Sequence, residues 1–122
     1  INNYKSFWCA EKIQNEMLRF ELENHRKPWV ALMGLAFKPN IDDLRESPAK
    51  SITSKVLQSG NNSQIMIVEP NVPEHNLFKL TNYKEAYEKA DIVVFLVNHN
   101  EFAELNYRND VKVLDFCGTF RK

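Results

Sequence analysis

The residues best suited to chemistry gather in one polar segment, where Lys38 and Arg45 flank two acidic residues, Asp42 and Asp43. A lysine ammonium is a compact charge, and an arginine guanidinium can bind a phosphate through two parallel hydrogen bonds. A solvated lysine and a structural ion pair with the neighbouring carboxylates are the alternative interpretations. The acidic residues are expected to brace the segment, since no histidine or cysteine joins them to hold a metal. The segment by itself predicts an anion or nucleotide site.

The elements on either side place this segment in a fold. Val30 to Met33 is expected to form a buried strand that stops at Gly34, and Ser47 with Pro48 should start a helix. In an open α/β sheet, ligands sit beyond the carboxyl ends of the strands and near helix N-termini, which attract anions. The cationic segment is therefore predicted to lie where such a fold binds its ligand.

The rest of the chain predicts an α/β, Rossmann-like fold, with a mostly parallel sheet flanked by helices and preceded by a long N-terminal helix. Helices are expected at 49–59 and 83–90, and strands at 65–68, 92–97 and 111–114, with 92–97 central because it is apolar throughout. The long helix over 3–24 is expected to present one apolar face, which packs on the sheet or on other domains; its members are Tyr4, Phe7, Trp8, Ile13, Met17 and Phe20.

Several stretches resemble one known family. The run GLAFKPNIDDLRESPA is similar to the signature that opens the C-terminal, UDP-binding domain of the UDP-glucose/GDP-mannose dehydrogenases. The runs VEPN, KADIVVFLVNHNEF and VLDFCGTFR continue the resemblance in the family's order, and INNYKSFW resembles its interdomain helix. Within the family, PNIDD looks most like the branch that oxidises UDP-N-acetyl-D-mannosamine.

The resemblance implies roles for individual residues. Phe37 and Lys38 match the pair that contacts the UDP-sugar, and Arg45 matches an arginine that reaches the cofactor's diphosphate across the interdomain cleft. Some relatives place a substrate-contacting basic residue where this chain has Cys117. Arg121 is therefore expected to take over that contact with the substrate.

The implied activity is NAD-dependent 6-dehydrogenation of a UDP-sugar. The C6 alcohol becomes a carboxylate through a thioester on a cysteine, and the uronic acid serves capsular or envelope polysaccharide. That nucleophile belongs to an upstream segment, so neither Cys9 nor Cys117 is assigned a catalytic role. His99 is expected to be a hydrogen-bonded turn residue and not a catalyst. No GxGxxG motif is present, so NAD is expected to bind mainly to a missing N-terminal domain.

The chain alone is thus expected to bind a UDP-sugar without turning it over. A dehydrogenase of another UDP-sugar, such as UDP-glucose or UDP-N-acetylglucosamine, is one alternative. A stand-alone nucleotide-binding module is another, and a full-length protein without the upstream domains would favour it. The third is a dimerisation module, which dimerisation without UDP binding would favour.

Composition limits the other possibilities. The 122 residues include 16 basic and 16 acidic side chains, so no net field favours nucleic acid or an anionic membrane. Two cysteines outside any CxxC pattern suit a cytoplasmic protein. The chain starts without a methionine and is expected to be a fragment, with an interdomain or dimer-type helix at 1–27 and the UDP-sugar-binding domain at 28–122. The full-length enzyme is expected to be a homodimer.

Overall fold

The computed structural model describes residues 3–35, 48–58, 64–72, 78–106 and 108–117. Helices and strands alternate along this part of the chain, as expected. The elements are α1 (Asn3–Asn24), β1 (Val30–Met33), α2 (Pro48–Leu57), β2 (Ile65–Val68), α3 (Tyr83–Lys89), β3 (Ile92–Phe95), the 3₁₀ helix η2 (Asn100–Glu104) and β4 (Lys112–Asp115).

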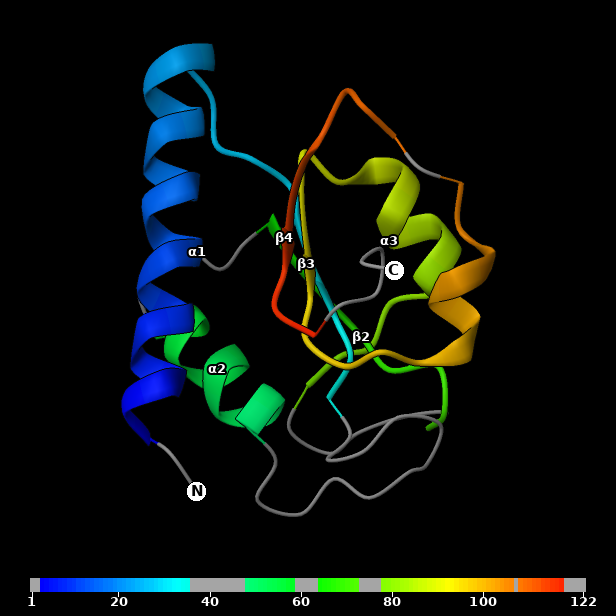
Figure 1. Ribbon diagram of the computed structural model, residues 1–122. Helices are drawn as coiled ribbons and strands as arrows, with labels where there is room; N and C mark the ends of the chain where they lie inside the picture. Colours follow the sequence, from blue (N-terminus) through cyan, green and yellow to red (C-terminus); the bar gives the residue numbers. More distant parts are fainter. Residues whose placement is uncertain (1–2, 36–47, 59–63, 73–77, 107, 118–122) are drawn as a thin grey trace.

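The four strands form one sheet in the order β2-β1-β3-β4, and every neighbouring pair is parallel. Helices α1 and α2 lie on one side of the sheet and α3 lies on the other (Figure 1). The two interior strands, β1 and β3, are buried along their whole length. The predicted Rossmann-like parallel sheet is therefore confirmed, with the strand that begins at Ile92 in the interior.

Alternation along β1 divides the core into two layers. Val30 and Leu32 pack with α1 and α2, whereas Ala31 and Met33 pack with α3. Successive side chains of a strand point to opposite faces, so a strand covered on both faces must be apolar at every position. Burial on both faces explains why β1 is an unbroken apolar run in the sequence.

Helix α1 does not have the single apolar face that was predicted. Ile13 and Met17 are buried, but Phe7 is 64% and Trp8 43% exposed. At about 100° per residue, these two aromatic residues lie about 120–140° around the helix axis from Ile13 and cannot share its face. Small residues, among them Cys9, face the core instead, and α1 packs closely on α2. Phe7 and Trp8 lie at the margin of the core, where the Lys55 ammonium of α2 lies 4.7 Å from the Phe7 ring centroid and Phe116 packs edge-on against Trp8.

The segment after α1 is anchored to the start of β3. The Asp91 carboxylate accepts hydrogen bonds of 2.9 and 3.0 Å from the two terminal nitrogens of Arg26 and one of 2.9 Å from the Trp29 N–H. Burial acts to raise the pKa of Asp91, but these hydrogen bonds outweigh it and hold the pKa below its usual value. Asp91 thus fixes where the chain enters β1.

The predicted strand 92–97 is shorter in the structure and ends at Phe95. The N–H groups of Leu96 and Val97 both point to the Met33 carbonyl, at 2.9 and 3.3 Å, so the regular ladder ends there. The predicted bounds of α1, β1 and β2 are confirmed, and those of α2, α3 and β4 differ from the structure by at most two residues. Among the described residues, no helix is both long and apolar enough to cross a membrane.

Candidate functional site

The carboxyl ends of the parallel strands meet at one edge of the sheet (Figure 1). Gly34 follows β1, Glu69 follows β2, Leu96 follows β3 and Phe116 follows β4. A parallel α/β sheet binds its ligands at this edge, because the loops there can differ without disturbing the core. The polar groups at this edge are therefore the candidate site.

Gly34 controls how the chain leaves β1. Its φ of +110° lies in a region that residues with side chains rarely adopt. A Cβ atom at this position would lie 2.7 Å from the Cβ of Val97. The Gly34 N–H donates a 2.8 Å hydrogen bond to the Val68 carbonyl. The backbone directly after β1 (the exit from β1) is thus fixed between the residues that follow β2 and β3, and only glycine fits at position 34.

Glu69 joins the same three exits through its carboxylate. Oε1 accepts a 2.8 Å hydrogen bond from the Leu35 N–H, and Oε2 accepts one of 2.9 Å from the Asn71 N–H. Oε1 also lies 3.0 Å from Nε2 of His99, which follows β3. Glu69 is only 3% exposed and His99 is fully buried. A buried carboxylate with several hydrogen-bond partners is a strong, directional link between loops.

The hydrogen-bond partners of the two ring nitrogens indicate which nitrogen of His99 carries the proton. The side-chain nitrogen Nδ2 of Asn71 lies 3.0 Å from Nδ1 of His99. An amide nitrogen can only donate, so Nδ1 accepts this hydrogen bond. Nε2 then carries the proton and donates to Glu69. The ring also packs edge-on against Phe102, with the ring centroids 5.6 Å apart. His99 is therefore a hydrogen-bonded residue after a strand, as predicted, and it serves to hold Glu69.

The environment of Glu69 shifts its pKa in a defined direction. Burial acts to raise the pKa, but hydrogen bonds from His99, Leu35 and Asn71 stabilise the charged form more and lower the pKa below its usual value. Glu69 is thus ionised at neutral pH.

We expect acid to destabilise the fold through Glu69 and Asp91. Both pKa values are lower in the folded state than in the unfolded chain, so their stabilisation is complete above about pH 5 and is lost as the pH falls through the folded values. Urea unfolding from pH 7 to pH 3 should show a falling midpoint, with a smaller fall in Glu69→Gln. An equal fall in that variant would contradict the assignment to Glu69.

The residues that sequence reasoning assigned to the site lie outside the described part of the chain. Phe37, Lys38 and Arg45 fall within 36–47, and Arg121 falls within 118–122. The described residues on either side of the first segment, Leu35 and Pro48, both lie at the carboxyl edge. The Leu35 N–H binds Glu69, and Pro48 lines a cavity.

That cavity has a volume of about 210 Å³ and lies between α1, the start of α2 and the ends of β3 and β4. Its lining is mainly apolar and includes Cys9, Leu96 and Phe116. A second cavity of about 240 Å³ opens beside Glu69, toward the start of α3. The carboxyl edge is therefore hollow on both faces of the sheet.

The cysteines differ in their surroundings. Cys9 is 1% exposed and lines the apolar cavity beside α2. The Asp115 carboxylate accepts a 3.3 Å hydrogen bond from the Cys117 N–H and lies 3.8 Å from its sulfur. Neither arrangement activates a thiolate. In the described ranges, no three histidine, cysteine or carboxylate side chains group in a way that could hold a metal.

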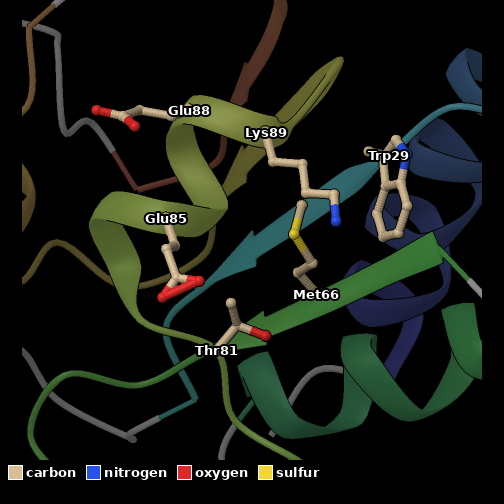
Figure 2. Close-up of a pocket in the computed structure, with 6 residues that line it drawn as sticks. All are labelled: Trp29, Met66, Thr81, Glu85, Glu88 and Lys89. Atoms are coloured by element: carbon tan, nitrogen blue, oxygen red, sulfur yellow. The ribbon is translucent and has the colours of Figure 1, made fainter.

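A larger hollow of about 460 Å³ lies elsewhere, between α3 and β2 (Figure 2). Lys89 and Trp29 lie side by side at one end, with the ammonium 3.9 Å from the indole centroid, and Glu85 extends from α3 at the other. This ammonium is already in contact with an aromatic ring, and neither Glu69 nor His99 lines the hollow. Volume alone does not make it the candidate site.

Sequence reasoning missed the pairing of Glu69 with His99. It assigned Glu69 no role and described His99 only as a hydrogen-bonded turn residue. The available signal was their position, since each follows a parallel strand by one to four residues and the carboxyl ends of those strands share an edge. Their separation by β1 in the sheet order hides the contact from any argument based on neighbouring strands.

A parallel α/β sheet with its polar groups gathered at the carboxyl edge defines a Rossmann-like ligand-binding domain. Residues 31–119 match the model of the UDP-binding domain of the UDP-glucose/GDP-mannose dehydrogenase family. The chain therefore belongs to the UDP-glucose/GDP-mannose dehydrogenase family and corresponds to its UDP-binding domain.

Individual relatives agree with this assignment. A UDP-N-acetyl-D-mannosamine dehydrogenase of Campylobacter jejuni is 41% identical over 124 aligned positions, covering 96% of this chain and 28% of the relative. The Escherichia coli K12 enzyme of the same name is 34% identical, covering 99% and 31%. The chain thus spans less than a third of these relatives.

Solved structures share the fold. The UDP-N-acetyl-mannosamine dehydrogenase of Staphylococcus aureus superposes with a TM-score of 0.70 at 22% identity, covering 99% of this chain and 29% of that protein. A UDP-N-acetyl-D-mannosamine dehydrogenase from Pyrococcus horikoshii gives a TM-score of 0.68 at 24% identity, covering 93% and 27%.

Proposed function

We propose that this chain is the UDP-sugar-binding part of an NAD-dependent UDP-N-acetyl-D-mannosamine 6-dehydrogenase. The match of residues 31–119 to the family's UDP-binding domain carries the proposal. The names of the two curated relatives support the choice of sugar. The product would be a UDP-uronic acid for capsular or envelope polysaccharide.

In this proposal the chain binds and positions its ligand and performs no chemical step. Lys38 contributes a charge to the diphosphate, Phe37 contributes its backbone and ring, and Arg121 contacts the substrate. The buried, hydrogen-bonded Glu69 holds the exit from β1, which leads directly to Phe37 and Lys38. Positioning of a bound substrate lowers the barrier of a reaction that other groups carry out.

The described residues do not fit NAD. A dinucleotide site needs a glycine-rich turn after the first strand, so that the backbone can approach the diphosphate. Here Gly34 is the glycine after β1, and Val97 fills the space where its side chain would be. In this proposal the described residues take no part in NAD binding. We place NAD on the rest of a longer dehydrogenase, which supplies the hydride acceptor, with Arg45 as a contact from this chain.

The proposal includes a homodimeric, cytoplasmic parent enzyme with no nucleic-acid or membrane partner. Four large apolar side chains on α1 are exposed, as expected for a helix that packs on other parts of a larger protein: Phe7, Trp8, Leu18 and Leu22. Equal numbers of acidic and basic residues support the absence of a polyanionic partner.

Calorimetric titration of the purified chain tests the proposal. We expect UDP to bind at one site with a Kd below about 1 mM, which corresponds to roughly −4 kcal/mol, and NAD to bind at least tenfold more weakly. With UDP-N-acetyl-D-mannosamine and NAD, no NADH should form. Dimerisation without UDP binding would instead favour an assembly domain, and NADH production free of host enzymes would contradict the assignment of the chemistry to another region.

A further inference from the structure

Glu69 and His99 form a contacting pair of buried polar side chains at the carboxyl edge of the sheet, and the partly buried Asn71 completes the cluster. Glu69 is 3% exposed and His99 is fully buried, although both come from turns at the edge of the sheet. Burying a carboxylate carries a free-energy penalty unless it is well paired. The arrangement therefore calls for a reason beyond closing a turn.

The hydrogen bonds show what the cluster holds. Leu35, whose N–H reaches Glu69 Oε1 at 2.8 Å, immediately precedes segment 36–47, and Asn71, whose N–H reaches Oε2 at 2.9 Å, ends the turn after β2. His99 holds the same oxygen as Leu35, from the far side of β1, at 3.0 Å. One carboxylate thus fixes three strand exits relative to one another.

We propose that Glu69 is a positioning residue for the nucleotide site, and that His99 acts through Glu69 by donating its Nε2 proton to it. The inference rests on the proposed function, because the positioned site is the UDP site. Neither side chain needs to touch UDP, since Glu69 sets the backbone from which the ligand-contacting segment starts. The structural contribution of the His99 ring and the contribution of its Nε2 donor can be separated by substitution.

Two substitutions at one position make this separation. In His99→Gln the side-chain amide nitrogen can occupy the place of Nε2 and still donate to Glu69. In His99→Asn the shorter amide reaches only the place of Nδ1, beside Asn71, and leaves Glu69 without that donor. Both variants remove the ring that packs 5.6 Å from Phe102, so they share the packing loss. Glu69→Gln tests the carboxylate itself, because the amide nitrogen that replaces one carboxylate oxygen can only donate and leaves the Leu35 or the Asn71 N–H without its acceptor.

The experiment is calorimetric titration of the wild-type chain and these three variants with UDP, at a temperature well below each melting point. We expect Glu69→Gln and His99→Asn to weaken UDP binding at least tenfold, and His99→Gln to stay within about threefold of the wild type. If Glu69→Gln does not fold, the two His99 variants decide the matter.

The other outcomes overturn the inference in different ways. Equal UDP affinity in all variants, with lower melting points, would make the cluster purely structural and would leave the proposed function intact. Equal weakening in both His99 variants would assign the effect to the ring and not to its donor. A wild-type chain that does not bind UDP would reject the proposed function, and the positioning role with it.

Discussion

Replacing Gly34 with alanine should destabilise the fold by about 2–5 kcal/mol. The backbone conformation, with φ at +110°, costs a residue with a side chain roughly 1–2 kcal/mol. The new Cβ would also lie 2.7 Å from the Cβ of Val97, and overpacking of this kind adds about 1–3 kcal/mol. The total is a large share of the about 5–15 kcal/mol that holds a domain together. Urea unfolding of both proteins measures it.

A second substitution separates the two causes. Val97→Gly removes the Cβ and Cγ2 atoms that lie 2.7 and 3.0 Å from the new Cβ and leaves the backbone nitrogen at 3.0 Å, so the double variant Gly34→Ala/Val97→Gly should lose less stability than the two single variants combined. The backbone strain stays in the double variant. A Gly34→Ala protein within about 0.5 kcal/mol of the wild type would show that the chain can leave β1 by another route.

Replacing Lys38 with alanine should weaken UDP binding ten- to a hundredfold. A charge-assisted hydrogen bond to a phosphate is worth roughly 1.5–3 kcal/mol, which corresponds to this change in affinity. A surface lysine paired with Asp42 or Asp43 would contribute under about 1 kcal/mol, and chiefly to stability. Titration with UDP beside a melting curve separates the two roles.

Lys112→Ala is the matched control. Lys112 begins β4 at the opposite edge of the sheet, where its ammonium lies 3.9 Å from the Glu16 carboxylate. The substitution removes the same charge from the chain, so any general electrostatic effect on UDP should be equal in both variants. A folded Lys38→Ala protein that binds UDP as tightly as Lys112→Ala would return Lys38 to a structural role.

The fold could be predicted because the strong local signals agree with one another. The apolar run that begins at Ile92 is long enough to require burial on both faces, and Pro48 marks the first residue of α2. The prediction for α1 was wrong because it counted apolar residues without following their angles around the helix. Phe7 and Trp8 are apolar but exposed, and the smaller Cys9 is buried.

The candidate site was only partly accessible from the sequence. Gly34 was recognised as the end of β1, but its contact with Val97 depends on how β1 and β3 pair. The pairing of Glu69 with His99 joins positions 30 residues apart on strands that are not neighbours in the sheet. No local pattern contains that information. The roles of Phe37, Lys38, Arg45 and Arg121 stay predictions, since these residues lie outside the described ranges.

The most direct test of the central claim is to map UDP on the chain by amide chemical shifts. UDP at the carboxyl edge should shift the amide signals of Leu35, Asn71 and His99 most strongly, in proportion to the fraction bound. The amide signals of Met66 and Lys89, which line the larger hollow between α3 and β2, should stay in place. Shifts centred on Met66 and Lys89, or no shifts at millimolar UDP, would contradict a nucleotide site at the carboxyl edge.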